Sequence, residues 1–228
     1  MNLPNSISLA RIIASPLLAL LPFVQSVPVR AVAFALYMVT AISDHWDGKI
    51  ARSRGLITDL GKILDPLADK LLLVGTFVPM FLLQGHPADP LVQLLPAVAE
   101  RSAYPFVTWG GEAVWFPWWV LVLILGREAF MTWFRSFAQA RGTVIAAQQL
   151  GKWKAGFQYT WMGAGYLWFL IKLLLDEQRW HGPIAMFWAQ LLGGIGLLAM
   201  SGAFVLTFIS LVDYLVRHHD VFTRRVTG

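Results

Sequence analysis

Long apolar runs alternate with short charged connections along the chain. A helix needs roughly 20 apolar residues to cross about 30 Å of hydrocarbon. Six segments meet this requirement, and the last of them contains several glycines. They are Ile7–Phe23, Val29–Ile50, Ile63–Leu83, Trp115–Phe137, Ala155–Leu175 and Ile184–Leu215. The pattern predicts an all-α integral membrane protein with six transmembrane helices, the first of them retained rather than cleaved as a signal peptide, and a single domain over residues 1–228.

The positions of Lys and Arg predict the orientation of these helices, because cytoplasmic loops collect positive charge. Basic residues gather in the second-to-third connection, in the fourth-to-fifth connection and in the C-terminal tail. They are Lys49, Arg52, Arg54, Lys62, Arg135, Arg141, Lys152, Lys154, Arg217, Arg224 and Arg225. Both termini are therefore expected to face the cytoplasm, and residues 84–112, rich in Pro and Gly, are expected to form a plain loop on the far side whose apolar part can lie in the membrane interface.

Composition agrees with lipid as the solvent. Hydrophobic residues make up 57% of the 228 positions and charged residues only 14%, where a soluble domain usually carries about 25%. The net charge of +5 is explained by loops that face anionic headgroups, so it does not indicate nucleic-acid binding. The absence of cysteine excludes disulfides, thiolate metal sites and cysteine nucleophiles.

Aspartates cluster where the second predicted helix ends and the third begins, in the stretch DHWDGKIARSRGLITDLGKILDPLAD. Asp44 and Asp47 share one helical face, as do Asp65 and Asp69, with Pro66 at a position where the first turn of a helix tolerates proline. Four converging carboxylates need cations between them, and oxygen ligands without His or Cys favour Mg²⁺, Mn²⁺ or Ca²⁺. Two such ions can clamp a phosphoryl centre.

Glycines and an arginine accompany the carboxylates. Glycine lets phosphates approach the backbone closely, and Arg52 can donate charge-assisted hydrogen bonds to a phosphate. The ordinary alternative is that the aspartates pair with the nearby Lys and Arg in a solvated loop. That alternative suits Asp59, whereas the helical spacing of the other four favours a common site.

The stretch resembles the signature of the CDP-alcohol phosphatidyltransferases, D-x2-D-G-x2-A-R-x8-G-x3-D-x3-D. All eight fixed positions match, namely Asp44, Asp47, Gly48, Ala51, Arg52, Gly61, Asp65 and Asp69. The resemblance implies a six-helix membrane fold, commonly a homodimer, with the active site at the cytoplasmic ends of the second and third helices. It further implies displacement of CMP from a CDP-linked donor by an alcohol, with two Mg²⁺ or Mn²⁺ ions as cofactors.

The resemblance also implies roles for the individual positions. Asp44, Asp47, Asp65 and Asp69 would ligate metal, and Asp69 would in addition act as the general base. Gly48, Ala51, Arg52 and Gly61 would line the CDP site.

A second resemblance concerns the acceptor. The segment from Gly126 to Gln158, the opening LPNSISLARI and the LDPLADK segment look like the corresponding regions of phosphatidylglycerophosphate synthases, which implies glycerol 3-phosphate as acceptor and CDP-diacylglycerol as donor. An anionic acceptor needs fixed positive charge, and the candidates are Arg127, Arg135, Lys152 and Lys154. Arg127 with Glu128 can equally form a structural ion pair.

Other hypotheses remain open at this point. The same chemistry can use inositol phosphate, serine or phosphatidylglycerol as acceptor. A divalent-cation transporter also carries intramembrane carboxylates, although near the bilayer midplane. A non-catalytic scaffold leaves the spacing of the eight residues unexplained. The favoured expectation is a multi-pass enzyme of a bacterial cytoplasmic membrane.

Overall fold

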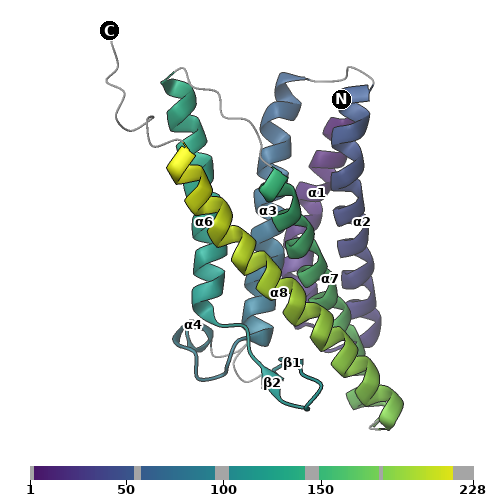
Figure 1. The fold of residues 1–228 in the computed structure, drawn as a ribbon. Helices are drawn as coiled ribbons and strands as arrows, with labels where there is room; N and C mark the ends of the chain where they lie inside the picture. Colours follow the sequence, from purple (N-terminus) through teal and green to yellow (C-terminus); the bar gives the residue numbers. More distant parts are fainter. Residues whose placement is uncertain (1–2, 54–57, 96–102, 142–148, 180–181, 218–228) are drawn as a thin grey trace.

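Six long helices run alternately up and down and form the body of the protein in the computed structural model (Figure 1). The structure describes residues 3–53, 58–95, 103–141, 149–179 and 182–217, with the backbone alone for 45–53 and Lys62. The long helices in this part of the chain are α1 (Leu3–Leu20), α2 (Val27–Ser53), α3 (Asp59–Gln84), α6 (Trp118–Ala140), α7 (Gln149–Glu177) and α8 (Pro183–Arg217). Each coincides with one of the six apolar segments, so the all-helical prediction is confirmed.

The third helix begins earlier than its apolar run suggested. Thr58 is its N-cap, and the Thr58 side chain accepts a hydrogen bond from the backbone N–H of Gly61. The cap adds a polar turn ahead of the apolar run, as Ser and Thr caps commonly do. Pro66 therefore lies inside α3, and the expectation that it occupies the first turn was wrong.

Four helices are long and apolar enough to cross a membrane among the described residues. These candidate spans are Leu3–Phe23, Val27–Asp44, Asp59–Gln84 and Pro183–Arg217. Large apolar side chains such as Ile13, Val39 and Leu198 are exposed on these helices, as expected of surfaces that face lipid. The helices α6 and α7 are not among these candidate spans, which require both sufficient length and sufficient mean hydropathy.

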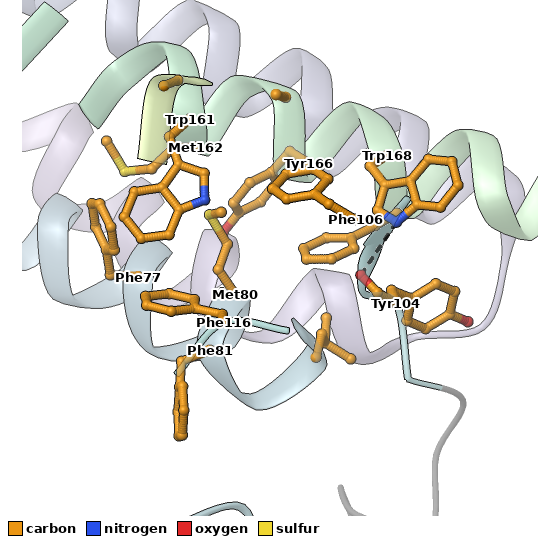
Figure 2. Close-up of a cluster of buried hydrophobic side chains, with 14 of the residues drawn as sticks. Phe77, Met80, Phe81, Tyr104, Phe106, Phe116, Trp161, Met162, Tyr166 and Trp168 are labelled. Atoms are coloured by element: carbon orange, nitrogen blue, oxygen red, sulfur yellow. Dashed lines mark hydrogen bonds between the residues drawn. The ribbon is translucent and has the colours of Figure 1, made fainter. Parts of the chain in front are cut away.

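The core lies mainly between α3 and α7 (Figure 2). Phe77 of α3 meets Trp161 of α7 edge to face with ring centroids 4.8 Å apart, and Phe116 lies 4.6 Å from the same indole. Met80 packs so closely on Gly165 that a Cβ there would overlap its side chain. This cluster joins the two halves of the bundle beneath the end where α2 finishes and α3 starts.

The segment between α3 and α6 is more ordered than the plain loop expected from the sequence. It contains the short helix α4 (Pro90–Gln93) and an antiparallel hairpin of β1 (Phe106–Val107) and β2 (Ala113–Val114). The hairpin packs on α8, where a Cβ at Gly193 would overlap the backbone of Val107 and one at Gly196 would overlap the ring of Phe106. Gly193 and Gly196 thus allow β1 to pack closely against α8.

Gly75 of α3 allows close approach of α1, because a Cβ at this position would lie 2.8 Å from the carbonyl oxygen of Ser15. We expect Gly75→Ala to push the two helices apart and to destabilise the protein by about 1–3 kcal/mol. The measurement is thermal unfolding of the detergent-solubilised protein. Gly126→Ala is the matched control, since nothing lies within 4 Å of its added methyl, and it should leave the melting temperature unchanged or raise it. Equal melting temperatures for both variants would contradict the close contact.

Candidate functional site

Three signature aspartates are described with their side chains, one on α2 and two on α3. Asp44 and Asp65 are half-buried, and the Asp69 side chain is 55% exposed. The backbone of α2 continues as helix through Asp47, Gly48, Ala51 and Arg52, so the predicted spacing on one helix is confirmed for the backbone. The side chains of these four residues lie outside the described part.

Arg11 of α1 joins the two helices that carry the signature. Its side chain is only 2% exposed, and its Nη1 donates to Asp44 Oδ1 and, over 2.9 Å, to Asp69 Oδ1. An arginine in this position satisfies two carboxylates that would otherwise repel each other. Arg11 lies within the first apolar run and was not among the predicted site residues, although a charge within such a run is itself a signal of a functional site.

Other polar side chains of α1 hold the start of α3. Ser8 Oγ donates to Asp65 Oδ1, and Asn5 Nδ2 donates to Thr58 Oγ1 over 3.0 Å. A Cβ at Gly61 would lie 2.9 Å from Asn5 Oδ1, so this signature glycine permits the contact between the two helices. Asn5, Ser8 and Arg11 recur every three residues along one face of α1, which is the sequence signal that was overlooked.

The helix α7 contacts the aspartates through the side chain of Tyr159. Its hydroxyl donates to Asp44 Oδ2 over 2.7 Å, while Arg11 occupies the other oxygen of the same carboxylate. Asp44 is thus held from α1 and from α7 at once. This residue too was not singled out from the sequence.

A cavity of about 430 Å³ opens beside the aspartates. Its lining includes Asp44 and Asp69 of α2 and α3, Lys70 of α3, and Glu128, Arg135, Lys152 and Lys154 of α6 and α7, with Leu72, Leu73 and Met162 among its apolar lining. Three of the four cations that the sequence suggested for the acceptor are therefore brought into one cavity with two of the signature aspartates. Arg127 is not among the lining residues.

Glu128 organises the basic side of the cavity. Its Oε1 accepts from Lys154 Nζ and, over 2.9 Å, from Arg127 Nη1, and Arg127 Nη2 in turn donates to Ser210 Oγ of α8 over 3.2 Å. Arg127 and Lys154 are buried, whereas Arg135 and Lys152 are exposed at the rim. The geometry favours the structural ion-pair alternative for Arg127.

The donor set fits a divalent cation. Asp44 Oδ1 and Asp69 Oδ1 both accept from one nitrogen of Arg11, so carboxylates of two helices face one positively charged point. Oxygen ligands without nitrogen or sulfur suit Mg²⁺ or Mn²⁺. Among the side chains that the structure describes, no three His, Cys, Asp or Glu residues gather as a complete metal site, and Asp47 lies outside them.

Comparison with known proteins identifies the family. The model of the family described as CDP-alcohol phosphatidyltransferase matches residues 1–198. A CDP-diacylglycerol–glycerol-3-phosphate 3-phosphatidyltransferase of Bacillus subtilis is 34% identical over 169 residues, which are 69% of this chain and 72% of the relative.

Two further relatives agree. A probable phosphatidylglycerophosphate synthase of Mycobacterium tuberculosis is 29% identical over 219 residues, 95% of this chain and 81% of the relative. A CDP-diacylglycerol–glycerol-3-phosphate 3-phosphatidyltransferase of Rickettsia bellii is 44% identical over 99 residues, 43% of this chain and 54% of the relative. With its signature residues on α2 and α3 beside a cavity that joins acidic and basic walls, the chain belongs to the CDP-alcohol phosphatidyltransferase family.

Proposed function

We propose that the protein transfers the phosphatidyl group of CDP-diacylglycerol to glycerol 3-phosphate, giving phosphatidylglycerophosphate and CMP. The observation that carries this proposal is that one cavity is lined both by Asp44 and Asp69 and by Arg135, Lys152 and Lys154. An enzyme that joins an anionic alcohol to a phosphoryl centre needs both walls: carboxylates for the reacting hydroxyl and cations for the phosphate. The names of the relatives support the same reaction.

The reaction is a single displacement. The acceptor hydroxyl oxygen forms a bond to the phosphorus that carries diacylglycerol, and the bond from this phosphorus to the oxygen of CMP breaks with its electron pair leaving on CMP. Asp69, the most exposed described carboxylate of the signature, takes the proton of the hydroxyl. Arg11 and Tyr159 hold Asp44 beside it in a fixed position.

Asp44, Asp47, Asp65 and Asp69 are the proposed ligands of Mg²⁺ or Mn²⁺, with two ions in the full site. When bound, such ions lower the pKa of a coordinated hydroxyl and neutralise charge on the leaving phosphate. Gly48, Ala51, Arg52 and Gly61 are proposed to line the CDP site, in line with their positions in the signature.

The acceptor phosphate is proposed to lie against Arg135, Lys152 and Lys154. Lys154 is buried and fixed by Glu128, so it offers its charge from one defined position, while the exposed Arg135 and Lys152 can close on the anion. Arg127 contributes through Glu128 instead of touching the acceptor.

The membrane arrangement follows from charge. We propose that all six long helices cross the bilayer of a bacterial cytoplasmic membrane, that the cavity and both termini face the cytoplasm, and that residues 1–228 act as one domain in a homodimer. Arg135, Arg141, Lys152 and Lys154 support this orientation, because they lie around the connection between α6 and α7.

A divalent-cation transporter is the alternative of another class. In the described part of the chain, Phe77 of α3 packs with Trp161 of α7 and with Phe116 in an aromatic cluster (Figure 2), and Phe77 lies two turns beyond Asp69 along α3. A transporter would need oxygen ligands along this path, so the packing favours the enzyme.

We expect Asp69→Asn to lower CMP release at least about 100-fold, because an amide cannot accept the proton of the attacking hydroxyl. The assay uses purified protein in lipid with CDP-diacylglycerol and Mg²⁺ and compares glycerol 3-phosphate, inositol phosphate, serine and phosphatidylglycerol. Asp59→Asn is the matched control, since Asp59 is exposed in the first turn of the same helix and outside the signature. Release with another alcohol alone would change the acceptor, and no release with any of them would reject the enzyme hypothesis.

Neutralising the rim cations should weaken acceptor binding. For Arg135→Gln and Lys152→Gln we expect the KM for glycerol 3-phosphate to rise roughly 10-fold each, since a charge-assisted hydrogen bond contributes about 1.5–3 kcal/mol. Steady-state kinetics at fixed CDP-diacylglycerol measure this. Arg141→Gln, whose guanidinium lies over the ring of Phe137, should behave as the unaltered protein. A rise confined to the KM for CDP-diacylglycerol would instead assign these cations to the donor.

A further inference from the structure

Gln158 of α7 is a buried polar side chain that the proposed reaction has not yet used. It is 4% exposed and lines the cavity together with Asp44, Asp69 and Lys154. Its amide Nε2 is buried without a hydrogen-bond partner among the residues that the structure describes. A buried amide in this situation loses its hydrogen bonds to water without replacement, which is costly unless a ligand supplies a partner.

The position of Gln158 along α7 indicates which part of a ligand it meets. Lys154 lies four residues earlier on the same face, at the basic side of the cavity, and Tyr159 follows directly and donates to Asp44. Gln158 therefore lines the cavity from the same face of α7 as Lys154, on the helix that also contacts Asp44 through Tyr159. Met162, one turn further along α7, belongs to the buried hydrophobic cluster (Figure 2) and also lines the cavity.

Glycerol 3-phosphate carries one polar group on each of its three carbons. Its phosphate is on one terminal carbon, the attacking hydroxyl is on the other, and a secondary hydroxyl is on the carbon between them. With the phosphate at Arg135 and Lys152 and the attacking hydroxyl at Asp69, the secondary hydroxyl lies inside the cavity that Gln158 also lines, and the amide of Gln158, unpartnered among the described residues, can supply its hydrogen bond.

Resting on the proposed function, we propose that Gln158 is a specificity-determining residue that hydrogen-bonds the secondary hydroxyl of the acceptor alcohol. A site built to bond a hydroxyl rejects an analogue that lacks it, because the polar group of the protein is then left unpaired. The same bond fixes the configuration at the middle carbon, since the mirror-image glycerol phosphate directs this hydroxyl away from the amide.

The test compares three acceptors in the CMP-release assay: glycerol 3-phosphate, its mirror image glycerol 1-phosphate, and 3-hydroxypropyl phosphate, which lacks the secondary hydroxyl. For the unaltered protein we expect kcat/KM to favour glycerol 3-phosphate over the other two by roughly 10- to 100-fold. Gln158→Leu should remove most of this preference by slowing glycerol 3-phosphate while leaving 3-hydroxypropyl phosphate nearly unchanged.

Gln84→Leu is the matched control. Gln84 is also buried, at 1% exposure, and its amide also lacks a partner among the described residues, yet it lies at the far end of α3 and does not line the cavity. This variant should keep the full preference among the three acceptors. Gln158→Asn keeps the amide on a shorter side chain and should give an intermediate preference; it decides the question if Gln158→Leu does not fold.

The outcomes separate this inference from the function on which it rests. Failure of the unaltered protein to use glycerol 3-phosphate rejects the proposed function itself. Turnover of glycerol 3-phosphate with an equal rate for 3-hydroxypropyl phosphate, or a preference that survives in Gln158→Leu and Gln158→Asn, overturns the role of Gln158 alone.

Discussion

The contact of Arg11 with Asp44 and Asp69 is the interaction on which the rest of the site depends. One nearly buried guanidinium from α1 holds carboxylates of α2 and α3, which fixes these two helices relative to each other at the end where they carry the signature. Arg11 is buried although Asp44 and Asp69 are partly exposed, so removing the carboxylates would leave a buried guanidinium without compensating charge. The bonds that shape the site therefore also hold the first three helices together.

The charged residues that line the cavity come from two pairs of helices. The proposed reacting carboxylates are on α2 and α3, whereas the cations proposed to bind the acceptor phosphate and Gln158 are on α6 and α7. The negative charge of Glu128 offsets part of the positive charge on α6 and α7, since Glu128 accepts hydrogen bonds from both Lys154 and Arg127. Ser210 of α8 accepts a further hydrogen bond from Arg127. The offset is incomplete, because Arg135 and Lys152 line the same cavity and are not among the hydrogen-bond partners that the structure describes for Glu128.

Features that depend on local pattern were predictable from the sequence, and those that depend on distant contacts were not. Apolar length gave the long helices, and the eight signature residues gave the aspartates of α2 and α3 and the family. The start of α3 was missed because a single side chain, Thr58, caps it ahead of the apolar run. Ser8, Arg11 and Tyr159 were missed because their partners are 57, 33 and 115 residues away.

The division between the two walls has a consequence for how acceptor specificity can vary within such a fold. Tyr159 of α7 connects the helix of Lys154 and Gln158 with the aspartates, since its hydroxyl donates a hydrogen bond to Asp44 and it lines the cavity together with Gln158. If Lys154 and Gln158 have the proposed roles, a substitution at either would change what the cavity recognises without altering the carboxylates of α2 and α3. A substitution at Tyr159 touches both, because it also removes a partner of Asp44. Among enzymes with this fold that accept different alcohols, we therefore expect the α7 residues without contact to the aspartates to differ. The α1 residues that bind the aspartates should be the same in all of them.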